Sequence, residues 1–144
     1  MTARVLLAIL LAAGAGIGVA ASMGVPSPSA CTAIDGDTFD CAGERVRLMA
    51  IDAPELPGHC RRNRICAPGD PYASKANAAA MLLEGDHAII RSGKDRYGRT
   101  IGDVMVIGAN GNYWSVSCRQ LNGGFAIYKP RYDKRRMVKG KCNP

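Results

Sequence analysis

The sequence predicts a small domain of the mainly β, α+β class, built as a five-stranded barrel with two helices. Three observations support this fold class. Short segments alternate polar and apolar residues, as half-buried strands do. Seventeen glycines and eight prolines require many turns. A composition with 47% hydrophobic and 22% charged residues is ordinary for a globular protein and excludes a disordered chain.

The first three strands are expected in the N-terminal third of the domain. Residues 32–40 are rich in β-favouring residues around a tight turn at Asp35-Gly36-Asp37, which indicates a hairpin. Residues 45–51, RVRLMAI, alternate polar and apolar side chains and predict a third strand. Residues 52–70 contain three prolines and are expected to form a loop.

A helix is expected to follow that third strand. Asp70 can cap its N-terminus, with Pro71 in the first helical position, and Gly85 would end it. Its core-facing residues are expected to be those that share one helical face: Tyr72, Ala76, Ala79, Ala80 and Leu83.

Two more strands and a second helix complete the predicted domain. Residues 87–91 and 100–107 are expected to be strands joined by the turn SGKDRYGR, and residues 114–121 a helix stopped by Gly123-Gly124. The order is therefore three strands, a helix, two strands and a helix. Five short strands with a helix after strand 3 and a second helix after strand 5 fit a small closed barrel of the OB type.

The N-terminal segment has the features of an export signal. Arg4 precedes an uninterrupted apolar run from residue 5 to 21, followed by small residues and prolines up to residue 30. We therefore interpret residues 1–30 as a signal peptide or signal anchor with a short linker, and residues 31–144 as one domain with a basic C-terminal tail. The expected location is secreted or periplasmic. A membrane would be involved only through the N-terminal segment if it is uncleaved.

All six cysteines lie after this segment, and an even count in an exported small domain predicts three disulfides. A hairpin centred on Gly36 places Cys31 opposite Cys41. Cys60 and Cys66 bracket a short loop, and the remaining pair would fix the C-terminal segment. The predicted pairs are Cys31–Cys41, Cys60–Cys66 and Cys118–Cys142. A zinc site is the alternative, but the sequence has no C-x-x-C motif. Free thiols are the other alternative.

Charged residues cluster in motifs that point to phosphate chemistry. Asp37 and Asp52 at strand ends supply hard oxygen ligands for a cation such as Ca²⁺. Arg47 and Arg99 provide planar forks for phosphate oxygens, and Glu55 could activate a water molecule. Each motif alone is also explained by turn chemistry or surface ion pairing. Arg47, however, lies inside an alternating strand beside apolar residues, which places it in a cleft.

Three ordered motifs, IDGDT, RLMAIDAPE and KDRYGRTIGDVMV, are followed by a second helix and YKP. Together they resemble the thermonuclease family, that is, staphylococcal-nuclease-like proteins, over about residues 31–130. The resemblance implies an OB-type barrel and a Ca²⁺-dependent phosphodiesterase that acts on DNA and RNA. It also implies products with 3′-phosphate ends. The cofactor it implies is Ca²⁺, and the partners are DNA and RNA as substrates of a monomeric enzyme.

The resemblance also assigns roles to residues at matching motif positions. The implied calcium ligands are Asp37, Asp52 and the backbone carbonyl of Ala53. The implied catalytic residues are Arg47 and Arg99, which bind phosphate, and Glu55 as the proposed general base. The implied substrate-binding residues are Arg96, Tyr97 and Tyr128. Ala53 replaces a usual Thr, and the disulfide loop within residues 56–70 is not found in the best-known members.

Basic residues outside these motifs agree with a nucleic-acid substrate. Between Lys129 and Lys141 there are seven basic residues and one acid, and Arg61, Arg62 and Arg64 form a second cluster. Two other functions remain open: a non-catalytic OB-type module of the cell envelope that binds nucleic acid, and a disulfide-stapled envelope protein without a nucleic-acid role. An enzyme is favoured because a binding module needs neither the two carboxylates nor the proposed base.

Overall fold

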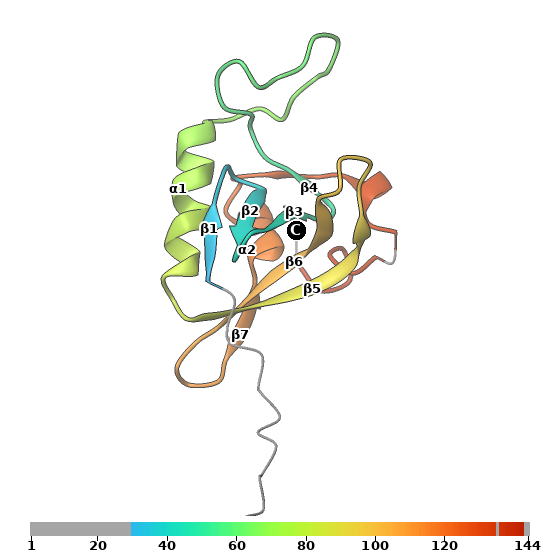
Figure 1. Ribbon diagram of the computed structural model, residues 1–144. Coiled ribbons are helices and arrows are strands. Elements are labelled where there is room, and N and C mark those ends of the chain that lie inside the picture. The colour runs from blue at the N-terminus through green and yellow to red at the C-terminus, as the bar shows by residue number, and fades with distance from the viewer. Residues whose placement is uncertain (1–29, 135, 143–144) are drawn as a thin grey trace, which may run out of the picture.

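The computed structural model describes residues 30–134 and 136–142 (Figure 1). The predicted export signal lies outside these residues. No helix within them is long and apolar enough to cross a membrane.

Over the described residues the fold is mixed α+β, mainly strands with two α-helices. In chain order the elements are β1 Cys31–Ala33, β2 Thr38–Cys41, β3 Glu44–Leu48, β4 Ile51–Asp52, α1 Pro71–Leu82, β5 Asp86–Lys94, β6 Thr100–Ile107, β7 Tyr113–Ser115, α2 Val116–Asn122, β8 Ile127–Tyr128 and the 3₁₀ helix η1 Pro130–Tyr132. The hairpin at the N-terminus, the strand that carries Arg47, and the strand pair β5–β6 agree with the sequence predictions.

One curved sheet forms the centre of the domain. Its strand order is β1-β2-β3-β6-β5, and β7 pairs with β6. β3 and β6 run parallel and the other pairs are antiparallel. The two end strands approach each other, since the Cys31 N–H donates a 3.0 Å hydrogen bond to Nδ1 of His87 on β5. Closure into a barrel stays a prediction, because the backbone ladders of the described residues end at β1 and β5.

All three predicted disulfides are present, joining Cys31 to Cys41, Cys60 to Cys66, and Cys118 to Cys142. Cys31 and Cys41 are direct partners in the β1–β2 ladder, as the hairpin register requires. Three disulfides in so small a domain indicate an extracytoplasmic location.

The first helix begins as predicted but buries a different face. Asp70 caps its N-terminus by accepting from the N–H groups of residues 72 and 73. The predicted core face was wrong, because Tyr72 is 62% exposed and Leu83 is 89% exposed. The buried residues are Ser74, Ala78, Met81 and Leu82, and the helix ends at Leu82 rather than near Gly85. Small side chains at 74 and 78 allow the helix to approach the β1–β2 turn, which longer ones would prevent.

The second helix is shorter than predicted. Residues 113–115 form β7, in which Trp114 pairs with Val106 of β6, so the helix begins at Val116. Ser115 is the N-cap and accepts from the N–H of Cys118. Residues 113–115 form a strand rather than the first turn of a helix, because their backbone groups pair with those of β6.

The C-terminal segment is packed rather than a free basic tail. β8 pairs with β4, so that Ile51 lies opposite Tyr128. Further on, Val138 and Cys142 are buried in a second small core with Met49 and Ala50. The Cys118–Cys142 disulfide ties this core to α2. This pairing matters for the site, because β4 carries Asp52 and the chain continues from β8 into Lys129.

Candidate active site

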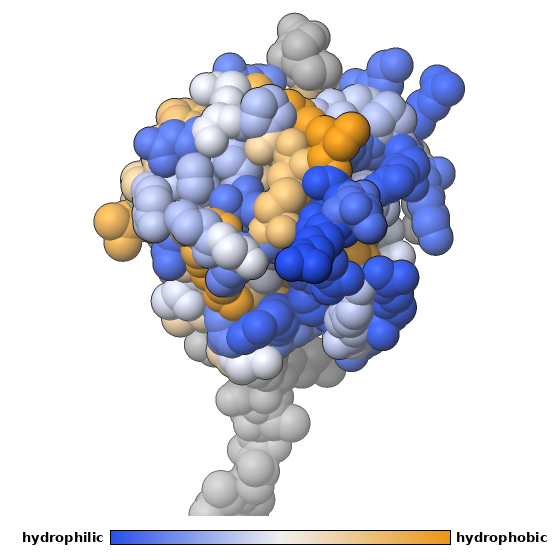
Figure 2. All heavy atoms as spheres, turned by 90° about the horizontal axis from the view of Figure 1, so that it is seen from above, coloured by the Kyte–Doolittle hydropathy of each residue, from blue (hydrophilic) through white to orange (hydrophobic). Residues whose placement is uncertain are grey.

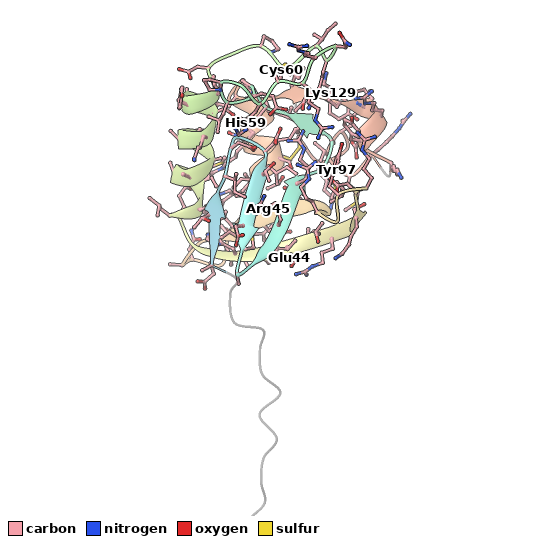
Figure 3. The ribbon with its side chains drawn as sticks, turned by 45° about the horizontal axis from the view of Figure 1, so that its top comes forward. Glu44, Arg45, His59, Cys60, Tyr97 and Lys129 are labelled. Carbon is pink, nitrogen blue, oxygen red and sulfur yellow. A yellow bond between two sulfur atoms is a disulfide. The ribbon has the colours of Figure 1, made fainter. Side chains whose placement is uncertain are left out.

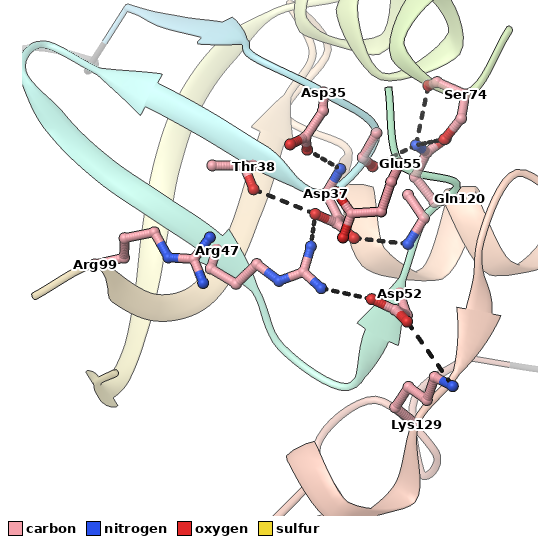
Figure 4. Close-up of polar contacts among 12 residues, drawn as sticks. Asp35, Asp37, Thr38, Arg47, Asp52, Glu55, Ser74, Arg99, Gln120 and Lys129 are labelled. Atoms are coloured by element: carbon pink, nitrogen blue, oxygen red, sulfur yellow. Dashed lines mark hydrogen bonds and ion pairs between the residues drawn. The ribbon is translucent and has the colours of Figure 1, made fainter. Parts of the chain in front are cut away.

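An acid–arginine centre, defined as Asp37, Arg47 and Asp52, lies at one end of β2, β3 and β4. The guanidinium of Arg47 contacts both carboxylates, with Nη1 on Asp37 and Nη2 at 2.9 Å from Asp52 Oδ1 (Figure 4). The side chains are 5%, 14% and 2% exposed, respectively. The antiparallel ladder sets this meeting, because Thr38 pairs with Arg47 and the Leu48 N–H donates to the Asp37 carbonyl.

The turn before Asp37 is fixed by close packing against α1 and α2. A Cβ on Gly36 would lie 1.9 Å from Ser74 Oγ and 2.7 Å from Ala53 Cβ, so the position requires glycine. Gln120, fully buried on α2, donates to the Gly36 carbonyl at 2.6 Å and to the Ser74 carbonyl at 3.1 Å. The Ala53 N–H then donates to Asp37 Oδ2 at 2.6 Å. The Asp37 carboxylate is therefore held from both sides.

Opposing effects act on the charge of Arg47. Burial lowers the pKa of the Arg47 guanidinium, and the negative charge of Asp52 raises it, with the net shift downward. Arg99 also lowers the Arg47 pKa, which means that the second predicted phosphate fork lies near the first. In Figure 4 the Arg47 guanidinium faces Asp37 and Asp52, and Arg99 is drawn on the other side of the Arg47 side chain. Two neighbouring cations beside buried acids form a site prepared for an anion that carries more than one charge.

Two further cations reach Asp52 from segments remote in sequence. Arg64, on the loop closed by Cys60–Cys66, lies 2.6 Å from Asp52 Oδ1 and 2.9 Å from Glu55 Oε1. Lys129 approaches Asp52 Oδ2 at 3.8 Å from the end of β8 (Figure 4). The predicted metal carboxylate Asp52 and the predicted base Glu55 are therefore brought together through Arg64. From the sequence, Arg64 and Lys129 are predicted only as members of basic clusters.

The turn of residues 95–99 forms a separate basic group around Tyr97. Arg99 is held within the turn, because its Nε donates to Asp95 Oδ2 at 2.7 Å. The Tyr97 ring is flanked by the guanidinium carbons of Arg61, Arg96 and Arg99, at 5.0, 4.8 and 5.6 Å from its centroid. Arg61 also donates to the Tyr97 hydroxyl, which lowers its pKa. An exposed phenol surrounded by cations suits a phosphate oxygen.

Tyr128 is placed differently from the other predicted substrate residues. Its hydroxyl donates to Asp133 Oδ2 at 3.0 Å, and Asp133 also accepts from the N–H groups of Val138 and Lys139. Burial and this bond raise the pKa of the Tyr128 hydroxyl. The Tyr128 hydroxyl is thus engaged with the C-terminal segment, while its strand lies beside Asp52.

The centre contains two carboxylates, and the Arg47 guanidinium contacts both of them. Asp37 and Asp52 offer carboxylate oxygens that contact the two terminal nitrogens of the same guanidinium. Ala53, whose carbonyl is the third expected ligand, follows Asp52 directly in the chain. Within the described residues, no group of three or more His, Cys, Asp and Glu side chains could hold a metal ion. A cation at Asp37 and Asp52 would therefore complete its coordination with backbone and water oxygens, which Ca²⁺ accepts.

A sequence profile of the staphylococcal nuclease homologue family matches residues 45–141, which include Arg47, Asp52, Glu55 and Arg99. The chain belongs to this family. The match to the staphylococcal nuclease homologue family begins after Asp37. Asp37 nevertheless contacts two residues of the matched region, Arg47 and Ala53.

A curated protein with a similar sequence is the succinoglycan biosynthesis protein ExoI of Rhizobium meliloti (strain 1021). The two sequences are 36% identical over 88 residues, which cover 58% of this chain and 44% of that protein. The chain therefore spans less than half the length of this relative.

Proposed function

We propose that the protein is an exported, calcium-dependent nuclease that hydrolyses phosphodiester bonds of DNA and RNA. The observation that carries this proposal is the acid–arginine centre, in which the guanidinium of Arg47 contacts two buried carboxylates, one directly before β2 and one on β4. Membership of the staphylococcal nuclease homologue family supports it.

The two arginines have the chemistry to lower the reaction barrier. A phosphodiester carries one negative charge and gains a second as water adds to phosphorus. Arg47 and Arg99, held close together, bind the doubly charged state more strongly than the ground state, and only such a difference accelerates the reaction. The salt bridge to Asp95 keeps the Arg99 fork oriented without filling all five of its N–H donors.

The acids divide the remaining work. Asp37, Asp52 and the carbonyl of Ala53 would hold Ca²⁺, which supplies neutralisation of a non-bridging phosphate oxygen when bound. Glu55, which is only partly exposed, would take the proton of the attacking water. Arg96, Tyr97 and Tyr128 would bind the substrate on either side of the reacting phosphate.

A non-catalytic nucleic-acid-binding module is the alternative, and one observation favours it. Asp52 is contacted by three cations, Arg47, Arg64 and Lys129, so its charge is balanced within the protein. A centre neutralised in this way could serve to hold a basic surface in shape. Binding without hydrolysis at any Ca²⁺ concentration would identify this module.

The test is degradation of plasmid DNA and of RNA over a Ca²⁺ series and in excess chelator. Degradation that requires Ca²⁺ is expected for the native chain. An Asp37→Asn/Asp52→Asn variant should lose it, whereas Asp86→Asn, which removes an exposed carboxylate from β5, should retain it. Full degradation in chelator would overturn the calcium assignment, and no degradation under any condition would overturn the nuclease.

A further inference from the structure

An open groove of about 680 Å³ lies beside the acid–arginine centre. One wall is the disulfide ring, defined as residues 60–66, and the other is the segment 129–131 that follows β8. Asp52 lies at its floor, at the point where the groove meets the centre. Figure 3 shows Cys60 of the ring and Lys129 of the opposite wall near each other at the top of the molecule, with Tyr97 below Lys129.

The walls carry positive charge. Arg64 lines the groove from the ring, and Lys129 and Arg131 line it from the opposite side. Figure 2 shows strongly hydrophilic residues gathered on the face that contains this end of the molecule. The one acid at the floor, Asp52, is 2% exposed and already paired with Arg47, so the groove attracts anions.

Arg64 retains donors for a ligand while it is anchored. Its bonds to Asp52 and Glu55 use one N–H on each terminal nitrogen, and a guanidinium carries five. Both bonds point the guanidinium toward the centre. Arg131 is held differently, stacked over the Tyr132 ring at 4.6 Å. The groove is therefore preorganised by one salt-bridged and one stacked arginine.

The ring also presents an apolar tip. Ile65, which follows Arg64 and lines the groove, is 93% exposed. An apolar side chain this exposed beside cations has no role in the core of the protein. The combination of phosphate-binding cations with an apolar platform for a base is how proteins hold single-stranded nucleic acid.

We propose that this groove binds the phosphate backbone of a single nucleic-acid strand next to the reacting phosphate, with Arg64 and Arg131 as its phosphate contacts. The Cys60–Cys66 disulfide holds Arg64 in place, because the ring lies outside the helices and strands and its residues 60–65 are exposed. This inference rests on the proposed function, since it extends the same site along the substrate.

The test is binding of a fluorescently labelled single-stranded DNA of about ten nucleotides, in excess chelator so that hydrolysis does not interfere. Arg64→Gln and Arg131→Gln should each weaken binding about tenfold, the expected size of one lost charged hydrogen-bond contact. Each should also reduce the slope of log affinity against log salt by about 0.7.

Arg62→Gln is the matched control, because Arg62 is exposed on the same ring but does not line the groove. It removes the same charge and should leave affinity within about twofold of the parent, because Arg62 makes no contact in the groove and an exposed charge is screened by salt. Equal losses for Arg62→Gln and Arg64→Gln would overturn the groove, because they would show a diffuse charge effect. Thermal melts of each variant confirm that the fold is retained.

Opening the ring provides an independent arm. Cys60→Ser/Cys66→Ser should bind like Arg64→Gln although it removes no charge, and parental affinity would show that the disulfide does not position Arg64. The Ca²⁺-dependent degradation assay separates the two proposals. If the native chain degrades nucleic acid but Arg62→Gln and Arg64→Gln bind DNA with equal affinity, the groove is rejected and the nuclease is retained. If Arg64→Gln and Arg131→Gln weaken binding and Arg62→Gln does not, but the native chain degrades nothing, the nuclease is rejected and the groove is retained.

Discussion

The acid–arginine centre and the disulfide ring place charged groups at the same end of the molecule by opposite means. The three side chains of the centre stand on strand ends, and each is at least 86% buried. Residues 60–65 of the ring are exposed and belong to no helix or strand. The geometry of the centre therefore comes from packing, whereas that of the ring comes from a covalent bond and two salt bridges. A change in the centre should act through the whole domain, and a change in the ring only locally.

The largest effect is expected from Arg47→Lys in the centre. A single ammonium cannot contact both carboxylates and a phosphate with the planar fork of a guanidinium. Loss of such a transition-state contact costs roughly 10²–10³ in rate, by analogy with oxyanion-hole deletions. Degradation rates at saturating Ca²⁺ measure it. Arg62→Lys on the ring is the control and should keep the parental rate, and a near-parental rate for Arg47→Lys would remove Arg47 from the catalytic residues.

The Cys118–Cys142 and Cys60–Cys66 disulfides sharpen the same contrast for stability. Cys118–Cys142 closes a segment with a sequence separation of 24 and holds a buried core, whereas Cys60–Cys66 has a separation of 6 and closes an exposed ring. Cys118→Ser/Cys142→Ser should therefore lower the unfolding free energy by about 3 kcal/mol or more, and Cys60→Ser/Cys66→Ser by less. Urea denaturation measures both. The reverse order would contradict the distinction between packed and covalently held regions.

Gly36→Ala tests whether packing positions Asp37. The added Cβ would overlap Ser74 Oγ, so the turn must shift, at a cost of about 1–3 kcal/mol in unfolding free energy. Rates should fall as well, because Asp37 follows directly. Gly58→Ala, at a loop glycine with open space but φ +80°, is a control for backbone strain alone. Calorimetry and degradation assays on both variants would reveal whether the rate loss is specific to Gly36.

The smallest effect is expected at Glu44, which begins the strand that carries Arg47. Hydrogen bonds from Arg91 and Thr100 lower the pKa of the Glu44 carboxyl from 4.5 to about 2. A depressed carboxyl pKa stabilises the fold above pH 4.5, and this contribution is lost as the pH falls toward 2. Because Arg91 is 56% exposed, the contribution is about 1 kcal/mol or less. Urea midpoints of Glu44→Gln should equal those of the parent near pH 2 and fall below them at pH 6.

The sequence predicted the hairpin, the disulfide pairs and the N-cap at Asp70, because these depend on local spacing and turn chemistry. The prediction that Arg47 does not lie on a free surface agrees with its side chain, which is only 14% exposed, because a charged residue within an alternating strand can face buried partners. The contacts that bring Arg64 and Lys129 to Asp52 were not predicted. The pairing of β4 with β8, which brings Lys129 to Asp52, is a two-residue ladder with no periodicity to detect.

The errors on the two helices have a related cause. Helical periodicity predicts Tyr72 and Leu83 in the core, but both are exposed. The turn at Gly36 packs closely against the helix face that carries the small side chain of Ser74. Trp114 was assigned to a helix, because its pairing with β6 depends on a neighbour in space. The contact of Arg64 with Asp52 depends on how the disulfide ring folds over β4. No pattern in the sequence encodes that arrangement.

The order of the disulfides along the chain has a consequence for biosynthesis. Each cysteine pairs with the next one in sequence: 31 with 41, 60 with 66, and 118 with 142. Of the 15 ways to join six cysteines, this is the one that results when thiols are joined strictly in the order of the chain. Each bridge can therefore form between cysteines that are already adjacent in the cysteine order, and the native connectivity requires no bond that must later be exchanged.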